Sequence, residues 1–276
     1  MTPTFGQERR RQIAAVVRKD LRVALSSKAV WMPLLIVPLI FIVILPLAVA
    51  LVAPQAAKEG ADVMREFEGF SPTLLESVAG LTDPQKVVVI FLGYIMAPLF
   101  LVLPVMFASV LAADSFAGEK ERKTIEALVY SPISDRDLVL AKMLSAWLPA
   151  VVVGAVAFIV YCLTANLAAW PVMGRVFLPT WLWGVLIVWV MPAMAAVALG
   201  ATVMVSARAN TFQEAYQLGA VVVLPLIAMV VAQATGVIYL SVWLVVALGA
   251  VLWVIAAVLV RLGGQRFRRA RIMGSV

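Results

Sequence analysis

Residues Val87 to Ala113 have the sequence VVVIFLGYIMAPLFLVLPVMFASVLAA, a run of 27 positions without a charged side chain. A helix of about 20 apolar residues is long enough to cross the roughly 30 Å hydrocarbon core of a bilayer. The segment is therefore predicted to span a membrane. The whole chain agrees with this, because 64% of its 276 residues are hydrophobic and only 13% are charged. A soluble domain carries about 25% charged residues.

Five further segments have a similar length and composition. The six predicted spans are residues 31–53, 87–113, 138–163, 180–205, 212–233 and 240–262. The predicted fold is an all-α polytopic membrane protein with six transmembrane helices, preceded by an N-terminal amphipathic interfacial helix. We expect an entry helix in residues 1–30, a transmembrane domain in 31–262 and a basic tail in 263–276. The transmembrane domain would include an external loop at 54–86 and a cytoplasmic loop at 114–137.

The basic residues predict the orientation of the spans. Most of them lie before the first span, between spans two and three, and after spans four and six: Arg9, Arg10, Arg11, Arg18, Lys19, Arg22, Lys28, Lys120, Arg122, Lys123, Arg136, Lys142, Arg208, Arg261, Arg266, Arg268, Arg269 and Arg271. The other side has Lys58, Arg65, Lys86 and Arg175. Because loops rich in Lys and Arg stay in the cytoplasm, both termini are predicted to be cytoplasmic. The net charge of +7 is interpreted in the same way and not as a nucleic-acid surface.

Aromatic residues are predicted to mark the outer interface of the membrane, where amphipathic rings gather. They are Trp170, Trp181, Trp183, Tyr239 and Trp243.

The segment before the first span has the pattern of an amphipathic helix. Ile13, Val16, Val17 and Leu21 recur at helical spacing, and basic residues fill the positions between them. Such a helix is expected to lie in the inner headgroup layer. The pattern is equally compatible with a topology anchor and with a helix that transmits motion.

The spans contain almost no ionisable groups: Lys142, Glu214 and Arg261 lie near span ends. Ion-coupled carriers need charges on the pathway, so the sequence disfavours a proton pump or antiporter. The chain has no histidine and no GxxxxGK[ST] phosphate loop. We therefore expect no catalytic residue, no metal or cofactor site and no ATPase activity in this chain. If the protein moves a solute uphill, a partner must supply the energy.

A segment rich in charged residues follows the second span: residues Asp114 to Lys142 have the sequence DSFAGEKERKTIEALVYSPISDRDLVLAK. Opposite charges four residues apart, at Glu119 and Lys123, predict a short helix. Pro132 ends it, and Ser134 is a candidate N-cap for the next helix. Charge alone leaves two interpretations open, a solvated loop and a docking element.

The sequence GEKERKTIEALVYSPISDRDLVLAK resembles the signature of the type-2 ABC-transporter permeases. The matching positions are Glu119, Lys120, Glu121, Arg122, Thr124, Glu126, Leu128, Ser131, Pro132, Ile133, Ser134 and Lys142. The chain has Lys123-Thr124 where many members have Gly-Thr. A second stretch, SARANTFQEA at residues 206–215, resembles the family's loop between spans four and five, and Thr211 with Glu214 forms a capping-box pattern there.

The resemblance implies a half-size permease. Two such chains pair, two separate ATPase subunits bind ATP and Mg, and the short helix after span two becomes a coupling helix seated in the ATPase. The implied docking residues are Glu119, Lys120, Glu121, Arg122, Thr124, Glu126, Leu128, Ser131 and Pro132. The expected location is the bacterial plasma (inner) membrane.

The expected function is export of a lipophilic or amphipathic small molecule, such as a drug, a peptide or a lipid-like compound, by a homodimer. Three alternatives stay open: a membrane anchor or sensor that binds an ATPase without transporting, a permease for polysaccharide, lipid-linked glycan or sodium, and a secondary carrier. Trp147, Tyr161, Trp189 and Trp253 could stack on sugars or serve in packing.

Overall fold

The computed structural model describes residues 11–19, 35–58, 72–122, 134–209 and 211–266. Within these ranges the chain is helical and contains no strand, and six helices are long and apolar enough to cross a membrane. They run over Leu35–Gln55, Asp83–Glu121, Asp137–Met173, Trp181–Ser206, Phe212–Ala234 and Val242–Gly263. The predicted all-α fold with six spans is therefore confirmed.

Most spans consist of several consecutive helical elements, and the short helix α5 lies between the first and second spans. Their bounds are η1 (Ile40–Ile44) and α3 (Leu45–Lys58); α5 (Pro72–Ser77); α6 (Asp83–Val88), η3 (Val89–Ile95), α7 (Met96–Phe100), α8 (Val102–Ala113), η4 (Asp114–Gly118) and α9 (Glu119–Glu121); α11 (Asp135–Met173); α12 (Trp181–Val185), η5 (Leu186–Val190) and α13 (Met191–Ser206); α14 (Phe212–Gly219), η6 (Ala220–Val223) and α15 (Leu224–Ala234); and α16 (Val242–Arg266).

The second and fourth spans form the centre of the bundle. In each of them 72% of the most apolar 18-residue stretch is buried, compared with 17% in the first, fifth and sixth spans. The outer helices α3, α11, α15 and α16 expose large apolar side chains such as Leu167 and Val254. A bilayer would cover such surfaces, because lipid tails are as apolar as these side chains.

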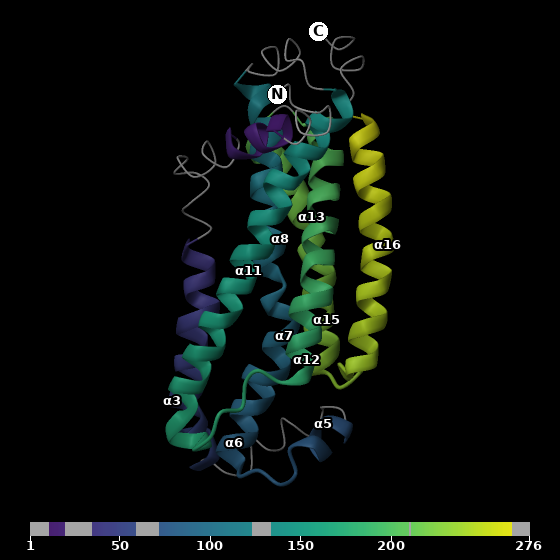
Figure 1. Ribbon diagram of the computed structural model, residues 1–276. Coiled ribbons are helices and arrows are strands. Elements are labelled where there is room, and N and C mark those ends of the chain that lie inside the picture. The colour runs from purple at the N-terminus through teal and green to yellow at the C-terminus, as the bar shows by residue number, and fades with distance from the viewer. Residues whose placement is uncertain (1–10, 20–34, 59–71, 123–133, 210, 267–276) are drawn as a thin grey trace, which may run out of the picture.

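The two ends of the bundle differ in what they contain (Figure 1). The helix at residues 11–19, α9 and the C-terminal end of α16 lie at one end, which we call the α9 end. α5 and α6 lie at the other, which we call the α5 end. In the 11–19 helix Ile13, Val16 and Val17 are partly buried and the basic Arg11 and Arg18 are exposed. This segment therefore has the amphipathic character that the sequence predicted.

The helices depart from α geometry just before several prolines. The π-helical turns η1, η3 and η5 precede Pro46, Pro98 and Pro192, and the 3-10 turn η6 precedes Pro225. A proline has no N–H for the carbonyl four residues earlier, and its ring clashes with that carbonyl. Rewinding the preceding turn relieves the clash, so the spans stay helical but bend.

Side chains from neighbouring spans bind backbone carbonyls of these distorted turns. Tyr161 Oη donates to Leu92 O at 2.7 Å, Trp183 Nε1 donates to Gly93 O at 2.8 Å, and Gln233 Nε2 donates to Tyr94 O at 3.0 Å. Pro98 cannot supply an N–H to Tyr94 O. Since lipid offers no hydrogen-bond donors, such contacts compensate for the distorted helix.

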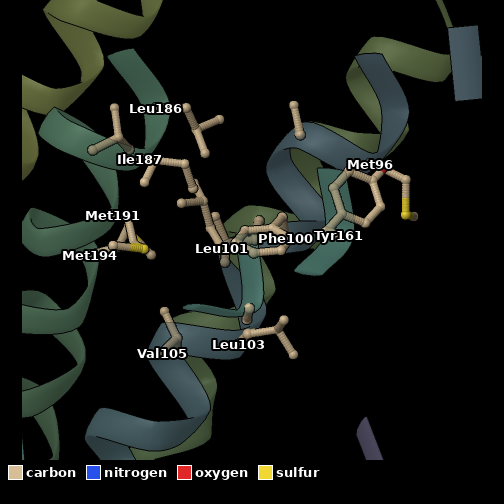
Figure 2. Packing of buried hydrophobic residues seen from close by; sticks show 14 of the residues in the cluster. Met96, Phe100, Leu101, Leu103, Val105, Tyr161, Leu186, Ile187, Met191 and Met194 are labelled. Atoms are coloured by element: carbon tan, nitrogen blue, oxygen red, sulfur yellow. The ribbon is translucent and has the colours of Figure 1, made fainter. Parts of the chain in front are cut away.

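An aromatic cluster fills the middle of the bundle. Phe100 lies between 5.5 and 5.7 Å from the rings of Trp183 and Tyr161, which are stacked on each other at 5.2 Å. Phe158 also stacks on Trp183, with ring centroids 5.6 Å apart. Figure 2 shows Phe100 and Tyr161 among the methionine and aliphatic side chains around them. Tyr161 is fully buried, so packing, not sugar stacking, is its role in the described fold.

Two sequence predictions about individual segments need correction. Trp183 does not lie exposed at the outer interface but is fully buried, because its N–H binds Gly93 O inside the bundle. Of the five aromatic residues predicted at the outer interface, Trp170, Trp181 and Trp243 are exposed. The third span is longer than predicted and ends at Met173, where Gly174 adopts a left-handed φ of 62° as the C-cap. Glycine tolerates this conformation and commonly ends helices.

Candidate functional site

The second span does not end where its charged residues begin. It continues through Asp114 to Glu121 by way of the π turn η4. Arg122 Nη1 donates to Asp114 Oδ1 at 2.9 Å, and Nη2 donates to Asp114 O at 3.3 Å. A Cβ at Gly118 would lie 3.0 Å from Asp114 Oδ1, so this glycine gives the ion pair its space. The predicted separate helix is thus, in its described part, an extension of the span.

Glu119 is the centre of an ion-pair cluster at the α9 end. It is only 5% exposed, and its two carboxylate oxygens lie 2.7 Å from Lys19 Nζ and 2.6 Å from Lys142 Nζ. Lys142 is equally buried and also donates to Ser115 O at 2.7 Å. The cluster joins the 11–19 helix, the end of span two and the start of span three. A buried charge is expected to be paired in this way, because desolvation of an isolated charge is costly.

The next two loop residues reach the connection between spans four and five. Lys120 Nζ donates to Ala209 O at 3.2 Å. Glu121 Oε2 accepts from the backbone N–H of Phe212, the first residue of α14, at 2.8 Å. A carboxylate is favourable there, because helix N-termini carry unpaired N–H groups and a positive dipole end. The two sequence motifs therefore meet in space.

The predicted helix caps are present at the same end. Ser134 Oγ accepts from Asp137 N at 3.2 Å at the start of α11 and donates to Asp137 Oδ2 at 2.9 Å. Thr211 Oγ1 accepts from Glu214 N at 3.2 Å at the start of α14. Both spans begin where the capping patterns predicted.

The predicted docking residues fall into two groups. Glu119, Lys120, Glu121 and Arg122 lie in the described part of the loop and all make contacts within the chain. The others lie outside the described residues: Thr124, Glu126, Leu128, Ser131 and Pro132. Docking to an ATPase therefore stays a prediction for all nine residues. The sequence analysis did not predict that Glu119 forms a buried ion pair inside the chain. Lys142, a charged residue near the end of an apolar span, was the feature that could have indicated it.

The described ranges hold no group of three or more His, Cys, Asp or Glu residues that could bind a metal ion. The chemistry of the α9 end is that of ion pairs and helix caps, which position helices.

The comparison with protein families identifies the class. Residues 14–242 match the family model described as "ABC-2 family transporter protein". The chain belongs to this family. The match covers residues 14–19 of the 11–19 helix, the first five spans and both sequence motifs, and stops at the first residue of α16. No curated protein matches the chain.

Membership in the ABC-2 family makes this chain a multi-pass membrane protein and a permease component of an ABC transporter. ABC-2 permeases work in general with an ABC ATPase. The cluster around Glu119 lies within the region that the family model matches.

Proposed function

We propose that the chain is the permease of an ATP-driven exporter that works as a homodimer with two copies of a separate ATPase. The ATPase subunits bind ATP and Mg and dock on the loop after span two. The protein lies in the bacterial plasma membrane with the α9 end in the cytoplasm, and its cargo is a lipophilic or amphipathic small molecule.

One observation carries the proposal: Glu119 joins three helices next to the docking loop. A load applied to this loop reaches the 11–19 helix through Lys19 and span three through Lys142. Lys120 and Glu121 extend the contact to spans four and five. We therefore assign residues 119–122 to the part of the coupling element that contacts the rest of the permease, and we propose that Glu126 and Leu128 bind the ATPase.

The cargo class follows from the near absence of charge in the spans. An apolar surface cannot compensate the desolvation of a strongly charged, hydrophilic solute. The apolar helices α3, α15 and α16 offer an exposed surface to a second copy or to lipid. A pathway between such surfaces suits a molecule that already partitions into membranes.

Co-purification tests the coupling assignment. A tagged permease expressed with its ATPase is expected to retain the ATPase and to support vanadate-sensitive ATP hydrolysis. Glu126→Lys combined with Leu128→Lys should lose both, because a charge would replace the apolar anchor of the interface. The matched control is Glu76→Lys, an exposed position on α5 at the opposite end. Normal binding and transport by the double variant would refute the docking assignment.

Cargo movement distinguishes the exporter from an anchor or sensor. In vesicles holding the permease and ATPase, lipophilic cargo should stimulate ATP hydrolysis and move across the membrane only with ATP. An intact complex that hydrolyses ATP without moving any cargo would favour the anchor. Uptake driven by an ion gradient in vesicles without ATPase would favour a secondary carrier.

A further inference from the structure

A cavity of about 710 Å³ opens at the α5 end, far from the ion-pair cluster. Its walls come from four parts of the fold. They are α5, the π turn η3, the connection from α11 to α12, and the connection from α15 to α16. The cavity is large enough for a small organic ligand, since ligand pockets commonly measure about 300–1,000 Å³.

The described lining residues combine aromatic rings with one charged side chain. Tyr94 and Tyr239 lie with ring centroids 6.2 Å apart, and Trp181 and Trp243 line the same cavity. Among the described residues that line the cavity, only Arg175 has a charged side chain. In the described ranges its guanidinium has no ion-pair partner.

The phenol of Tyr239 does not offset this positive charge. Burial, followed by the proximity of Tyr94, raises the pKa of Tyr239 to about 12. Tyr239 therefore stays protonated at physiological pH, and a side-chain hydrogen bond links its hydroxyl to Tyr94. The hydroxyls of Ser77, Thr180 and Ser241 add further hydrogen-bonding groups to the lining.

The position of the cavity favours an amphiphile. Trp181 and Trp243 are 79% and 83% exposed. Exposed tryptophans of membrane proteins gather at the level of the lipid head groups. A ligand at this level can place its polar group in the cavity while its apolar part stays in the membrane.

We propose that the cavity binds the anionic head group of an amphipathic molecule, with Arg175 pairing with a phosphate or carboxylate. A guanidinium binds such groups through two parallel N–H···O bonds. Two sources have this chemistry, an acidic phospholipid of the bilayer and an exported amphipathic anion. The binding itself does not depend on the proposed function, whereas identifying the ligand as cargo rests on it.

Binding of dodecyl phosphate to the full chain in phosphatidylcholine nanodiscs tests this site. Radiolabelled probe is measured, and the uptake by empty nanodiscs is subtracted. Saturable binding is expected, and Arg175→Gln should weaken it about tenfold, the usual scale for a lost charge-assisted hydrogen bond. Arg175→Lys should retain part of the affinity. The control Arg261→Gln, an exposed arginine towards the α9 end, should bind normally.

Competitors with the same tail define the head group. Dodecyl maltoside and dodecyltrimethylammonium should not displace the probe. Equal affinity in Arg175→Gln, or equal competition by the maltoside, would overturn the proposal. Arg175 is exposed, and thermal unfolding of each variant checks that the fold is intact.

Added phosphatidylglycerol separates the two sources. If an acidic phospholipid occupies the cavity, its addition to the nanodiscs lowers the apparent affinity for dodecyl phosphate. If affinity is unchanged, the site selects amphipathic anions other than the bilayer's own. Neither binding experiment involves an ATPase, so failure here leaves the permease proposal standing. Failed ATPase co-purification would likewise leave the binding site standing.

Discussion

Glu119 Oε2 lies 2.6 Å from Lys142 Nζ, and both side chains are less than 8% exposed. The pair connects the end of the second span to the first turns of α11. Replacing one member of a buried pair leaves the other charge without full compensation.

Glu119→Gln is therefore expected to lower the free energy of unfolding by about 3–5 kcal/mol. Lys142→Met should also destabilise the protein, and the double variant should recover much of the loss, because neither buried charge then remains. Denaturation of the full chain in mixed micelles measures these differences. The matched control is the Asp83–Lys86 pair, whose carboxylate is half exposed, and Lys86→Met should cost less than about 1 kcal/mol. Equal effects at the two pairs would contradict the assigned role of burial.

Lys19 should behave differently from Lys142, although both bind Glu119. Its side chain is 47% exposed, so Lys19→Met should change stability by less than about 1 kcal/mol. Because this pair attaches the 11–19 helix to span two, its loss should reduce the cargo moved per ATP hydrolysed. Transport and hydrolysis measured in the same vesicles give this ratio, with Arg11→Met, at an exposed position of the same helix, as the control. An unchanged ratio would show that the 11–19 helix is only an anchor.

Tyr161 supplies a hydrogen bond that the distorted second span needs. Its hydroxyl donates to Leu92 O at 2.7 Å in the buried core. Tyr161→Phe keeps the ring and removes the donor, so it should cost about 1 kcal/mol or more of unfolding free energy. Tyr216→Phe is the control, since the Tyr216 hydroxyl has no hydrogen-bond partner among the described residues. A larger loss in Tyr216→Phe would argue against this explanation.

The sequence predicted the spans because a run of about twenty apolar residues is best accommodated as a membrane-spanning helix. It predicted the caps because Ser134 and Thr211 each accept a hydrogen bond from a backbone N–H only three residues later. It did not predict the partners of Glu119, since Lys142 and Lys19 lie 23 and 100 positions away. Nor did it predict the burial of Trp183. Trp183 is buried where its N–H donates to Gly93 O in the π turn η3, a contact between residues 90 positions apart.

Gly249 lets α16 approach the fourth span closely. A Cβ at this position would overlap the indole ring of Trp189, whose N–H donates to Val246 O at 3.1 Å. Gly249→Ala should therefore displace the ring and cost about 1–3 kcal/mol, the usual range for overpacking. Gly184→Ala is the matched control, because nothing lies within 4 Å of its added Cβ. The control should be neutral or slightly stabilising, as alanine favours helix; equal losses would contradict the packing argument.

The distribution of basic residues predicts which end faces the cytoplasm, and labelling tests it directly. In a Cys162→Ser background, Arg11→Cys and Glu76→Cys place one thiol at each end of the bundle, both at exposed positions. Because Lys and Arg are retained on the cytoplasmic side, a membrane-impermeant maleimide should label Glu76→Cys in intact cells. Arg11→Cys should react only after permeabilisation, when both variants should react equally. Labelling of Arg11→Cys in intact cells would invert the topology and remove the α9 end from the reach of a cytoplasmic ATPase.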